Sequence, residues 1–191
     1  MDAKLLQSLA GAGSQPPKEK GDVSLLEFLD LQQLNCLNES SEYSLKNLLA
    51  SKSINTASNM WLQSDADEQL LLNITFNQTV RVKTLIIRSN DLAKAPKQIK
   101  LAVNRPNLGF EDVEDADEPG VAQIIDLSED HVLKGDPIAL RYVRFQAVNT
   151  LHIFVVNNHG NEDETVINAI DVIGLPVETT KDLSGLKPKE Q

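Results

Sequence analysis

From Gln69 to Ile173 the chain repeats one pattern, in which short apolar or alternating segments are separated by residues that favour turns. At least seven strands are predicted: Leu70 to Phe76, Val80 to Arg88, Gln98 to Val103, Gln123 to Leu127, Arg141 to Ala147, Leu151 to Asn157 and Ile167 to Ile173. Turns are predicted at Asn77-Gln78, Pro106-Asn107, Glu118-Pro119-Gly120, Asp136-Pro137 and Asn158-His159-Gly160. Many short strands with few helices indicate an all-β sandwich or barrel.

Alternation within these segments predicts which side chains face the core. In Val80-Arg81-Val82-Lys83 and Ile99-Lys100-Leu101 we expect the charged side chains to face water and their apolar neighbours to face inward. Before the first strand, two short apolar-periodic segments, Val23 to Leu29 and Ser44 to Leu49, predict short helical turns at the entrance to the domain.

The two ends of the chain differ in composition from this middle part. Residues 1–22 place Leu5, Leu6 and Leu9 on one helical face and then become a Gly- and Pro-containing polar segment, which predicts a flexible leader and linker. Residues 179–191 are polar and predict a flexible C-terminal tail. One folded domain over residues 23–178 is therefore expected, since a chain of 191 residues can bury a substantial core.

Charge and cysteine content exclude several classes of partner and compartment. The net charge is 18 − 28 = −10 and the pI is near 4.7, which disfavours nucleic acid and anionic membrane surfaces. Cys36 is the only cysteine, so no intrachain disulfide can form. Apolar runs such as residues 153–156 are far shorter than the ~18 residues needed to span a bilayer. We expect a monomer in the cytoplasm and nucleus, with neither nucleic acid nor membrane as a partner.

The charges are unevenly placed along the chain. Residues 81–105 hold seven Lys or Arg against Asp91 alone, whereas residues 106–136 hold ten carboxylates against Lys134 alone. Such a surface can steer a protein partner. The candidate contact residues are Glu111, Asp112, Glu114, Asp115, Lys94 and Lys97. The alternative is that the acidic run is solvated surface, held as an extended loop by mutual repulsion.

No pattern of residues in the chain supports catalysis or cofactor binding. Gly-x-Ser-x-Gly, Walker-type and Gly-x-Gly-x-x-Gly motifs are absent from the sequence. His131, His152 and His159 lack the spacing of a metalloprotease, and packing or exposure accounts for them. Cys36 has no cationic neighbour in sequence, which favours a small buried residue over a reactive thiol. We therefore predict a protein that is not an enzyme and needs no cofactor.

An acidic turn precedes the first long strand. Asp65, Asp67 and Glu68 can bind a cation through carboxylate oxygens; alternatively, Asp65 and Asp67 cap the turn through backbone amides and so set up the strand from Gln69. The spacing lacks the Gly and distal Glu of an EF-hand loop, which favours the second alternative.

Three segments in a fixed order carry a family resemblance. They are Cys36-Leu37-Asn38-Glu39, then Trp61-Leu62-Gln63-Ser64-Asp65-Ala66-Asp67-Glu68-Gln69-Leu70-Leu71-Leu72, then Leu140-Arg141-Tyr142-Val143-Arg144-Phe145-Gln146. Together they resemble the PITH domain, the proteasome-interacting module of thioredoxin-like proteins, over roughly residues 23 to 178. The closing strand would be Ile173-Gly174-Leu175-Pro176-Val177.

The resemblance implies a galactose-binding-like jelly roll that docks on the proteasome regulatory particle and, in longer relatives, carries a thioredoxin domain to it. The leader would then be either the last turn of a preceding thioredoxin domain or a disordered terminus. The rival hypothesis is a small-ligand or carbohydrate binder, because jelly rolls host many such sites in their loops. Sugar sites usually display exposed aromatic rings, and Trp61 is the only tryptophan.

Overall fold

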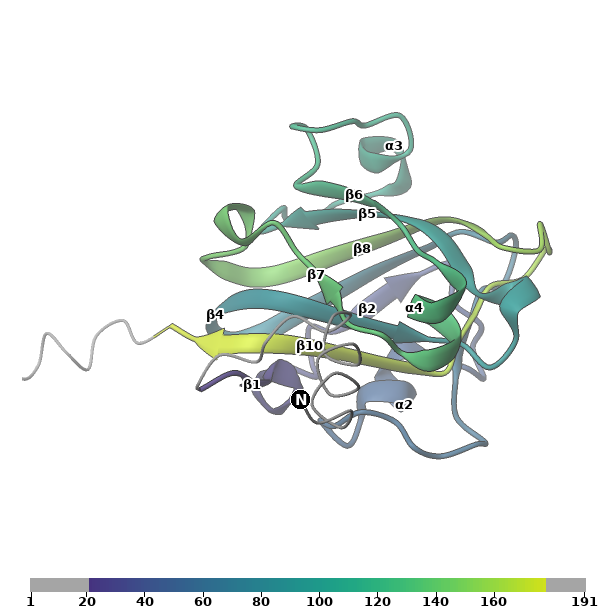
Figure 1. Ribbon diagram of the computed structural model, residues 1–191, viewed down its shortest axis with the longest axis horizontal. Coiled ribbons are helices and arrows are strands. Elements are labelled where there is room, and N and C mark those ends of the chain that lie inside the picture. Colours follow the sequence, from purple (N-terminus) through teal and green to yellow (C-terminus); the bar gives the residue numbers. More distant parts are fainter. Residues whose placement is uncertain (1–20, 178–191) are drawn as a thin grey trace, which may run out of the picture.

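The computed structural model describes residues 21–177, so the predicted leader up to residue 20 and the predicted tail from residue 179 lie outside the described residues. Within this part the chain forms an antiparallel β-sandwich, which confirms the all-β prediction (Figure 1). Eight strands form one continuous sheet in the order β1-β10-β4-β8-β5-β6, with β2 and β7 also pairing with β4. Two further strands, β3 (Leu62–Gln63) and β9 (Val166–Ile167), form a small separate ladder.

Strand β4 (Leu70–Arg88) connects the two halves of the sandwich. Its first part, residues 70–75, pairs with β8 (Val148–Asn158), and residues 71–73 also pair with β2 (Asn35–Leu37). Its second part, residues 80–88, pairs with β10 (Ala169–Pro176). The predicted turn at Asn77-Gln78 is therefore wrong. The ladder is only irregular between Thr75 and Val80, where the bulged strand bends and continues instead of reversing.

The remaining strands extend the sheet on both sides of β4. β5 (Pro96–Val103) pairs with β8 and with the edge strand β6 (Gln123–Asp126). On the other side, β1 (Val23–Ser24) pairs with β10, and β7 (Ile138–Ala139) pairs with residues 84–85 of β4. Figure 1 shows β5, β8, β4 and β10 side by side in this order, with β6 and β1 at the edges.

Alternating apolar residues form the core between the two halves. Leu72 and Ile74 of β4, Ile153 of β8 and Val172 of β10 are fully buried in one hydrophobic cluster. The two predicted helical turns are confirmed as the 3-10 helix η1 (Leu25–Phe28) and α2 (Leu45–Leu49). Both begin at a serine whose hydroxyl accepts a backbone N–H, and both bury leucines in the same core.

A second, smaller cluster covers part of the outer face of the sheet. Leu71, Ala102 and Phe154 pack there against the segment that contains α3 (Phe110–Val113). The prediction of an extended acidic loop is wrong for this segment, because α3 is held by Asp112, whose carboxylate accepts the Gly109 N–H at 2.8 Å.

Lys100 corrects a second expectation about this outer face. Its side chain was expected to face water, but α3 and its flanking residues cover it and it is buried. Its ammonium donates to the carbonyls of Val113, Glu114 and Ala116 at 3.1, 2.8 and 2.7 Å. Alternation placed Lys100 on the correct face, yet whether that face meets water depends on what packs against it.

Three short helical elements complete the described chain. η2 (Leu92–Lys94) precedes β5, and α4 (Glu129–Lys134), which the sequence pattern did not predict, ends at Gly135 in the left-handed region with φ 73°. The predicted strand Arg141 to Ala147 is wrong, since residues 142–144 form the 3-10 helix η3 (Tyr142–Arg144). All four residues from Arg141 to Arg144 are exposed, so this segment has no alternating buried face to hold it in the sheet.

No helix between residues 21 and 177 has both the length and the apolar character that crossing a bilayer requires.

Candidate functional site

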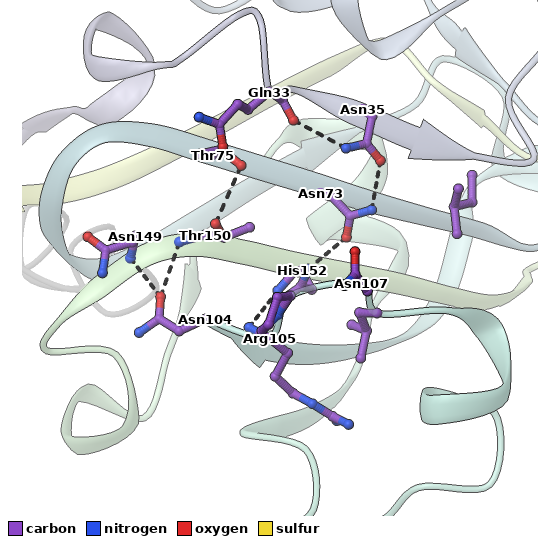
Figure 2. Close-up of a pocket in the computed structure, with 13 residues that line it drawn as sticks. Gln33, Asn35, Asn73, Thr75, Asn104, Arg105, Asn107, Asn149, Thr150 and His152 are labelled. Atoms are coloured by element: carbon purple, nitrogen blue, oxygen red, sulfur yellow. Dashed lines mark hydrogen bonds between the residues drawn. The ribbon is translucent and has the colours of Figure 1, made fainter.

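A polar groove of about 680 Å³ lies on the outer face of the sheet, where β2, β4 and β8 meet the loop of residues 104–108 (Figure 2). Most of its lining side chains are neutral hydrogen-bonding groups. The lining residues are Gln33, Asn35, Leu37, Asn73, Thr75, Asn104, Arg105, Pro106, Asn107, Leu108, Asn149, Thr150 and His152. We call this site the polar groove.

The period of the strands places these polar side chains on one face. In β4, Leu72 and Ile74 are buried in the core, whereas Asn73 and Thr75 between and after them line the groove. In β8, His152 likewise lines the groove between core residues Leu151 and Ile153. The outer face is therefore apolar under α3 and polar at the groove.

A row of hydrogen bonds crosses the groove from strand to strand (Figure 2). The backbone N–H of Arg105 donates to Nε2 of His152 at 3.1 Å, so this nitrogen carries no proton. Nδ1 of His152 must then carry the proton and donates to Oδ1 of Asn73 at 2.6 Å. Nδ2 of Asn73 donates to Oδ1 of Asn35 at 2.9 Å, and Nδ2 of Asn35 donates to the carbonyl of Gln33 at 3.2 Å.

This arrangement keeps His152 neutral. Burial and, to a smaller extent, the positive charge of Arg105 together lower the pKa of His152 to about 4. Both ring nitrogens are already bonded within the row. At pH 7 the imidazole therefore acts as a fixed structural link and has no free nitrogen with which to accept a proton from a substrate.

Asn104 and Arg105 shape the other wall of the groove. Asn104 has φ 56°, and its Oδ1 accepts the backbone N–H groups of Asn149 and Thr150 at 2.7 and 3.1 Å. Arg105 is the only charged side chain in the lining apart from the titratable His152. Its guanidinium makes no hydrogen bond or ion pair within residues 21–177, and Figure 2 shows it extending away from the row of amides.

The lining residues determine what the groove can do chemically. They include no Ser, Cys, Lys, Tyr, Asp or Glu, and the hydroxyls of Thr75 and Thr150 lie 3.4 Å apart with no base bonded to either, so among the described residues the groove offers no activated nucleophile and no acid–base pair. Amide groups present both donors and acceptors in fixed positions. The groove is therefore suited to recognising a hydrogen-bonding chain, and the sequence signal for it was the outward polar positions Asn73, Thr75 and His152.

A second hollow lies beside an aromatic pair. Tyr43 and Trp61 stack with ring centroids 4.1 Å apart and planes inclined by 13°. The adjacent hollow has a volume of about 330 Å³. Trp61 was identified from the sequence as part of the family signature, but its partner Tyr43 was not, because only the fold brings the segment before α2 to Trp61.

The sequence-predicted contact residues are found in separate places. Glu111, Asp112, Glu114 and Asp115 are exposed on and after α3. Lys97 is exposed at the start of β5, and the ammonium of Lys94 lies 3.3 Å from Oε2 of Glu164. In the described part of the chain no ion pair joins the four carboxylates to either lysine, so the assignment of these residues to a partner surface stays a prediction.

The acidic turn is organised by hydrogen bonds. Oδ1 of Asp67 accepts the backbone N–H of Gln69 at 3.0 Å, which confirms the capping role predicted for Asp67. It also accepts Nδ2 of Asn38 at 2.8 Å, and Oδ1 of Asn38 accepts the Ala66 N–H at 3.0 Å. The first two segments of the family resemblance therefore hold each other in place. Between residues 21 and 177 no three His, Cys, Asp or Glu side chains are placed to hold a metal ion.

Cys36 is a core residue, as predicted. Its side chain is buried among the leucines of the main cluster. Burial raises the pKa of the thiol well above its ordinary value, and the nearby Glu39 raises it further. The thiol is therefore protonated and inert near neutral pH.

Comparison with known proteins assigns the family. The model of the PITH domain matches residues 15–191. The chain belongs to the PITH domain family. This PITH domain is 37% identical over 173 residues to thioredoxin-like protein 1 of Schizosaccharomyces pombe, covering 89% of this chain and 57% of that protein. It is 34% identical to human PITH domain-containing protein 1, covering 90% of this chain and 78% of the human protein.

Solved structures similar to this PITH domain confirm the galactose-binding-like jelly-roll fold. A family 32 carbohydrate-binding module of Clostridium perfringens, solved with galactose, aligns with TM-score 0.56 at 8% identity, covering 80% of this chain and 98% of the module. Another family 32 module from a glycoside hydrolase of the same bacterium aligns with TM-score 0.51 at 15% identity, covering 83% and 99% of the two chains. At this level of identity the likeness describes the fold alone.

Proposed function

We propose that this PITH domain is a non-catalytic protein-interaction module that docks on the proteasome regulatory particle in the cytoplasm and nucleus. The observation that carries the proposal is the family match over residues 15–191. Docking on the proteasome is what membership of the PITH domain family implies. In longer relatives the same module would tether a thioredoxin domain to the particle. The relative named thioredoxin-like protein 1, of which this chain spans 57%, is consistent with such an arrangement.

The polar groove supports binding over catalysis. Its histidine is neutral and fully bonded, and its lining offers amide groups, two threonine hydroxyls and one guanidinium but no activated nucleophile. Fixed amide donors and acceptors suit the backbone of a protein partner, and they need no reorganisation when the partner binds. The acidic net charge of −10 disfavours nucleic acid and anionic membranes as partners.

The experiment that tests the proposal is capture of purified proteasomes by the immobilised 191-residue chain. Particles that carry the regulatory particle should be retained, and the isolated core particle should not. Retention of neither particle, or equal retention of both, would reject docking on the regulatory particle.

A small-ligand or carbohydrate-binding function is the rival proposal, and the polar groove is the observation that favours it. Galactose titrated into the isotope-labelled chain should leave the side-chain amide NMR signals of Asn35, Asn73 and Asn104 unmoved if the groove serves a protein partner. Saturable shifts of these signals would instead favour the carbohydrate function.

A further inference from the structure

The four residues Arg141 to Arg144 are looped out from the edge of the sandwich. Before this segment, the N–H of Leu140 donates to the carbonyl of Lys83 at 3.0 Å. After it, the carbonyl of Phe145 accepts the N–H of Val82 at 2.9 Å. The two anchoring positions on β4 are adjacent, so everything between Leu140 and Phe145 must protrude. We call residues 141–144 the basic knob.

The basic knob is held firmly although it is exposed. Leu140 and Phe145 are both buried and fix its two ends in the core. Inside the knob, the N–H groups of Arg144 and Phe145 donate to the carbonyls of Arg141 and Tyr142 at 2.9 and 3.1 Å. The guanidinium of Arg141 pairs with Glu118, and that of Arg144 donates to the carbonyl of Pro119 at 3.1 Å. A partner would therefore meet a pre-organised shape and lose little conformational entropy in ordering it.

The tip of the knob displays apolar surface that the fold does not use. Val143 is 73% exposed, the highest value among the large hydrophobic residues of the described chain, and Tyr142 is 46% exposed. Isolated exposed hydrophobic residues are common, but here a tyrosine, a valine and two arginines are adjacent on one rigid turn. Tyrosine and arginine are enriched among the residues that dominate the energy of protein interfaces.

Arg81 adds an incompletely satisfied cation beside the tip. Its guanidinium carbon lies 5.9 Å from the centroid of the Tyr142 ring. Its Nε atom is buried and has no hydrogen-bond partner within residues 21–177. Around the tip there are thus three arginines, and among residues 21–177 a carboxylate pairs with Arg141 alone. The Arg81 side chain as a whole is half-buried, so part of it stays open to a carboxylate of a partner.

We infer that the basic knob is a docking element whose partner site is an apolar pocket bordered by carboxylates on the proteasome regulatory particle. Val143 and the Tyr142 ring fill the pocket, and Arg81 and Arg144 face the carboxylates at its rim. This inference rests on the proposed docking function and names the surface that performs it. The surface is distinct from both the polar groove and the six contact residues predicted from the sequence.

The test compares variants of the whole 191-residue chain for binding to immobilised proteasomes that carry the regulatory particle. Val143→Ser should weaken binding about tenfold, and Arg81→Gln about fivefold, in line with the truncation of interface residues at the centre of a contact. The matched control is Leu133→Ser, which changes another exposed hydrophobic residue, 42% exposed on α4, and should alter binding less than about twofold. Circular dichroism melts should show that all three variants stay folded.

The outcomes separate this inference from the proposed function. If the unmodified chain binds and Val143→Ser binds equally well, the knob is not the docking element, although the docking function stands. If Arg81→Gln alone has no effect, the carboxylate rim is wrong. If the unmodified chain does not bind the regulatory particle, both the function and this inference are rejected. Binding to phosphatidylserine vesicles that Val143→Ser abolishes would assign the knob to a membrane surface and overturn the inference.

Discussion

At the scale of single residues, asparagine side chains hold together segments that are distant in sequence. Asn38 and Asn104 both have positive φ, at 67° and 56°, a conformation that asparagine tolerates better than most residues. In each case the side-chain amide bonds backbone groups that another strand would pair with in a regular β-ladder. Asn38 links the acidic turn to β2, and Asn104 links the groove loop to β8.

His152 leads to a prediction about stability and pH. Its pKa is about 4 in the folded chain, against 6.5 when it is unfolded. Between these values the unfolded state binds more protons, so stability is complete above about pH 6.5 and falls as the pH is lowered toward 4. His152 should contribute a loss of about 2 kcal/mol in the free energy of unfolding between pH 7.5 and pH 5.0.

Urea unfolding of the unmodified chain and of His152→Gln at both pH values measures this contribution. Glutamine has no group that titrates in this range, so the variant should lack that share of the loss, while every other titrating group contributes equally to both proteins. An identical loss in the two proteins would contradict the assignment of a neutral, desolvated His152.

At the scale of elements, a buried lysine allows an acidic segment to fold. Six carboxylates lie within residues 111–118, and their repulsion favours an extended chain. The ammonium of Lys100 counters this by bonding the three carbonyls of residues 113, 114 and 116 at the end of α3. These carbonyls carry the negative end of the helix, so the cation is favourably placed.

Replacing Lys100 with methionine should therefore destabilise the chain. The variant keeps a chain of similar length but leaves buried carbonyls without their donor, which should lower the free energy of unfolding by about 2–3 kcal/mol. Amide hydrogen exchange should accelerate in residues 110–117 before it does so in β8. Lys97→Met, on the same strand but exposed, is the control and should change stability by less than about 0.5 kcal/mol. Equal losses of unfolding free energy in the two variants would contradict the proposal that Lys100 stabilises the acidic segment.

Gly174 marks a close approach between β10 and β4. A Cβ atom at this position would lie 1.9 Å from the carbonyl oxygen of Arg81, at the point where the register of the two strands shifts. Gly174→Ala should lower the melting temperature much more than Gly135→Ala. At Gly135 the added Cβ atom meets no atom closer than 3.6 Å. The free energy of unfolding should fall there by only about 1 kcal/mol, because φ is 73°. A melting temperature that is lower for Gly135→Ala would contradict the close packing of these strands.

At the scale of the whole molecule, the folded chain keeps the uneven charge distribution of its sequence. The acidic residues on and after α3 remain exposed above β5 and β6, and Figure 1 shows this segment projecting at one end of the sandwich. The carboxylate of Asp112, however, caps α3 by accepting the Gly109 N–H. A test of the acidic surface must therefore leave Asp112 unchanged.

Reversing Glu111, Glu114 and Asp115 to lysine should lower the association rate with the regulatory particle several-fold at low salt, with a smaller change in the dissociation rate. The effect should shrink as ionic strength rises. A control with the same change in net charge, in which the exposed residues Glu42, Glu162 and Asp163 are reversed, should have less than half of that effect. Stopped-flow experiments over a range of salt concentrations measure these association rates. Association rates that are insensitive to both reversals would exclude the acidic surface from docking.

The sequence by itself determined the local features of this protein. The period of two requires Asn73 to face the opposite side from Leu72 and Ile74, because neighbouring side chains of a strand must point to opposite faces whatever packs on them. The apolar periodicity of residues 23–29 and 44–49 predicted both N-terminal helical turns. The three family segments likewise indicated the jelly roll, and the lack of a cationic neighbour in sequence favoured a buried Cys36.

Only the tertiary structure decided what meets each outward face. Asn73 forms the groove because Asn35 and His152, 38 and 79 residues away in sequence, lie on neighbouring strands and bond to it. Lys100 is buried because α3 covers it, and residues 141–144 leave the sheet because their two anchors bond to adjacent positions on β4. Alternation is a property of one strand, whereas burial, hydrogen-bond partners and protrusion depend on segments that folding brings together.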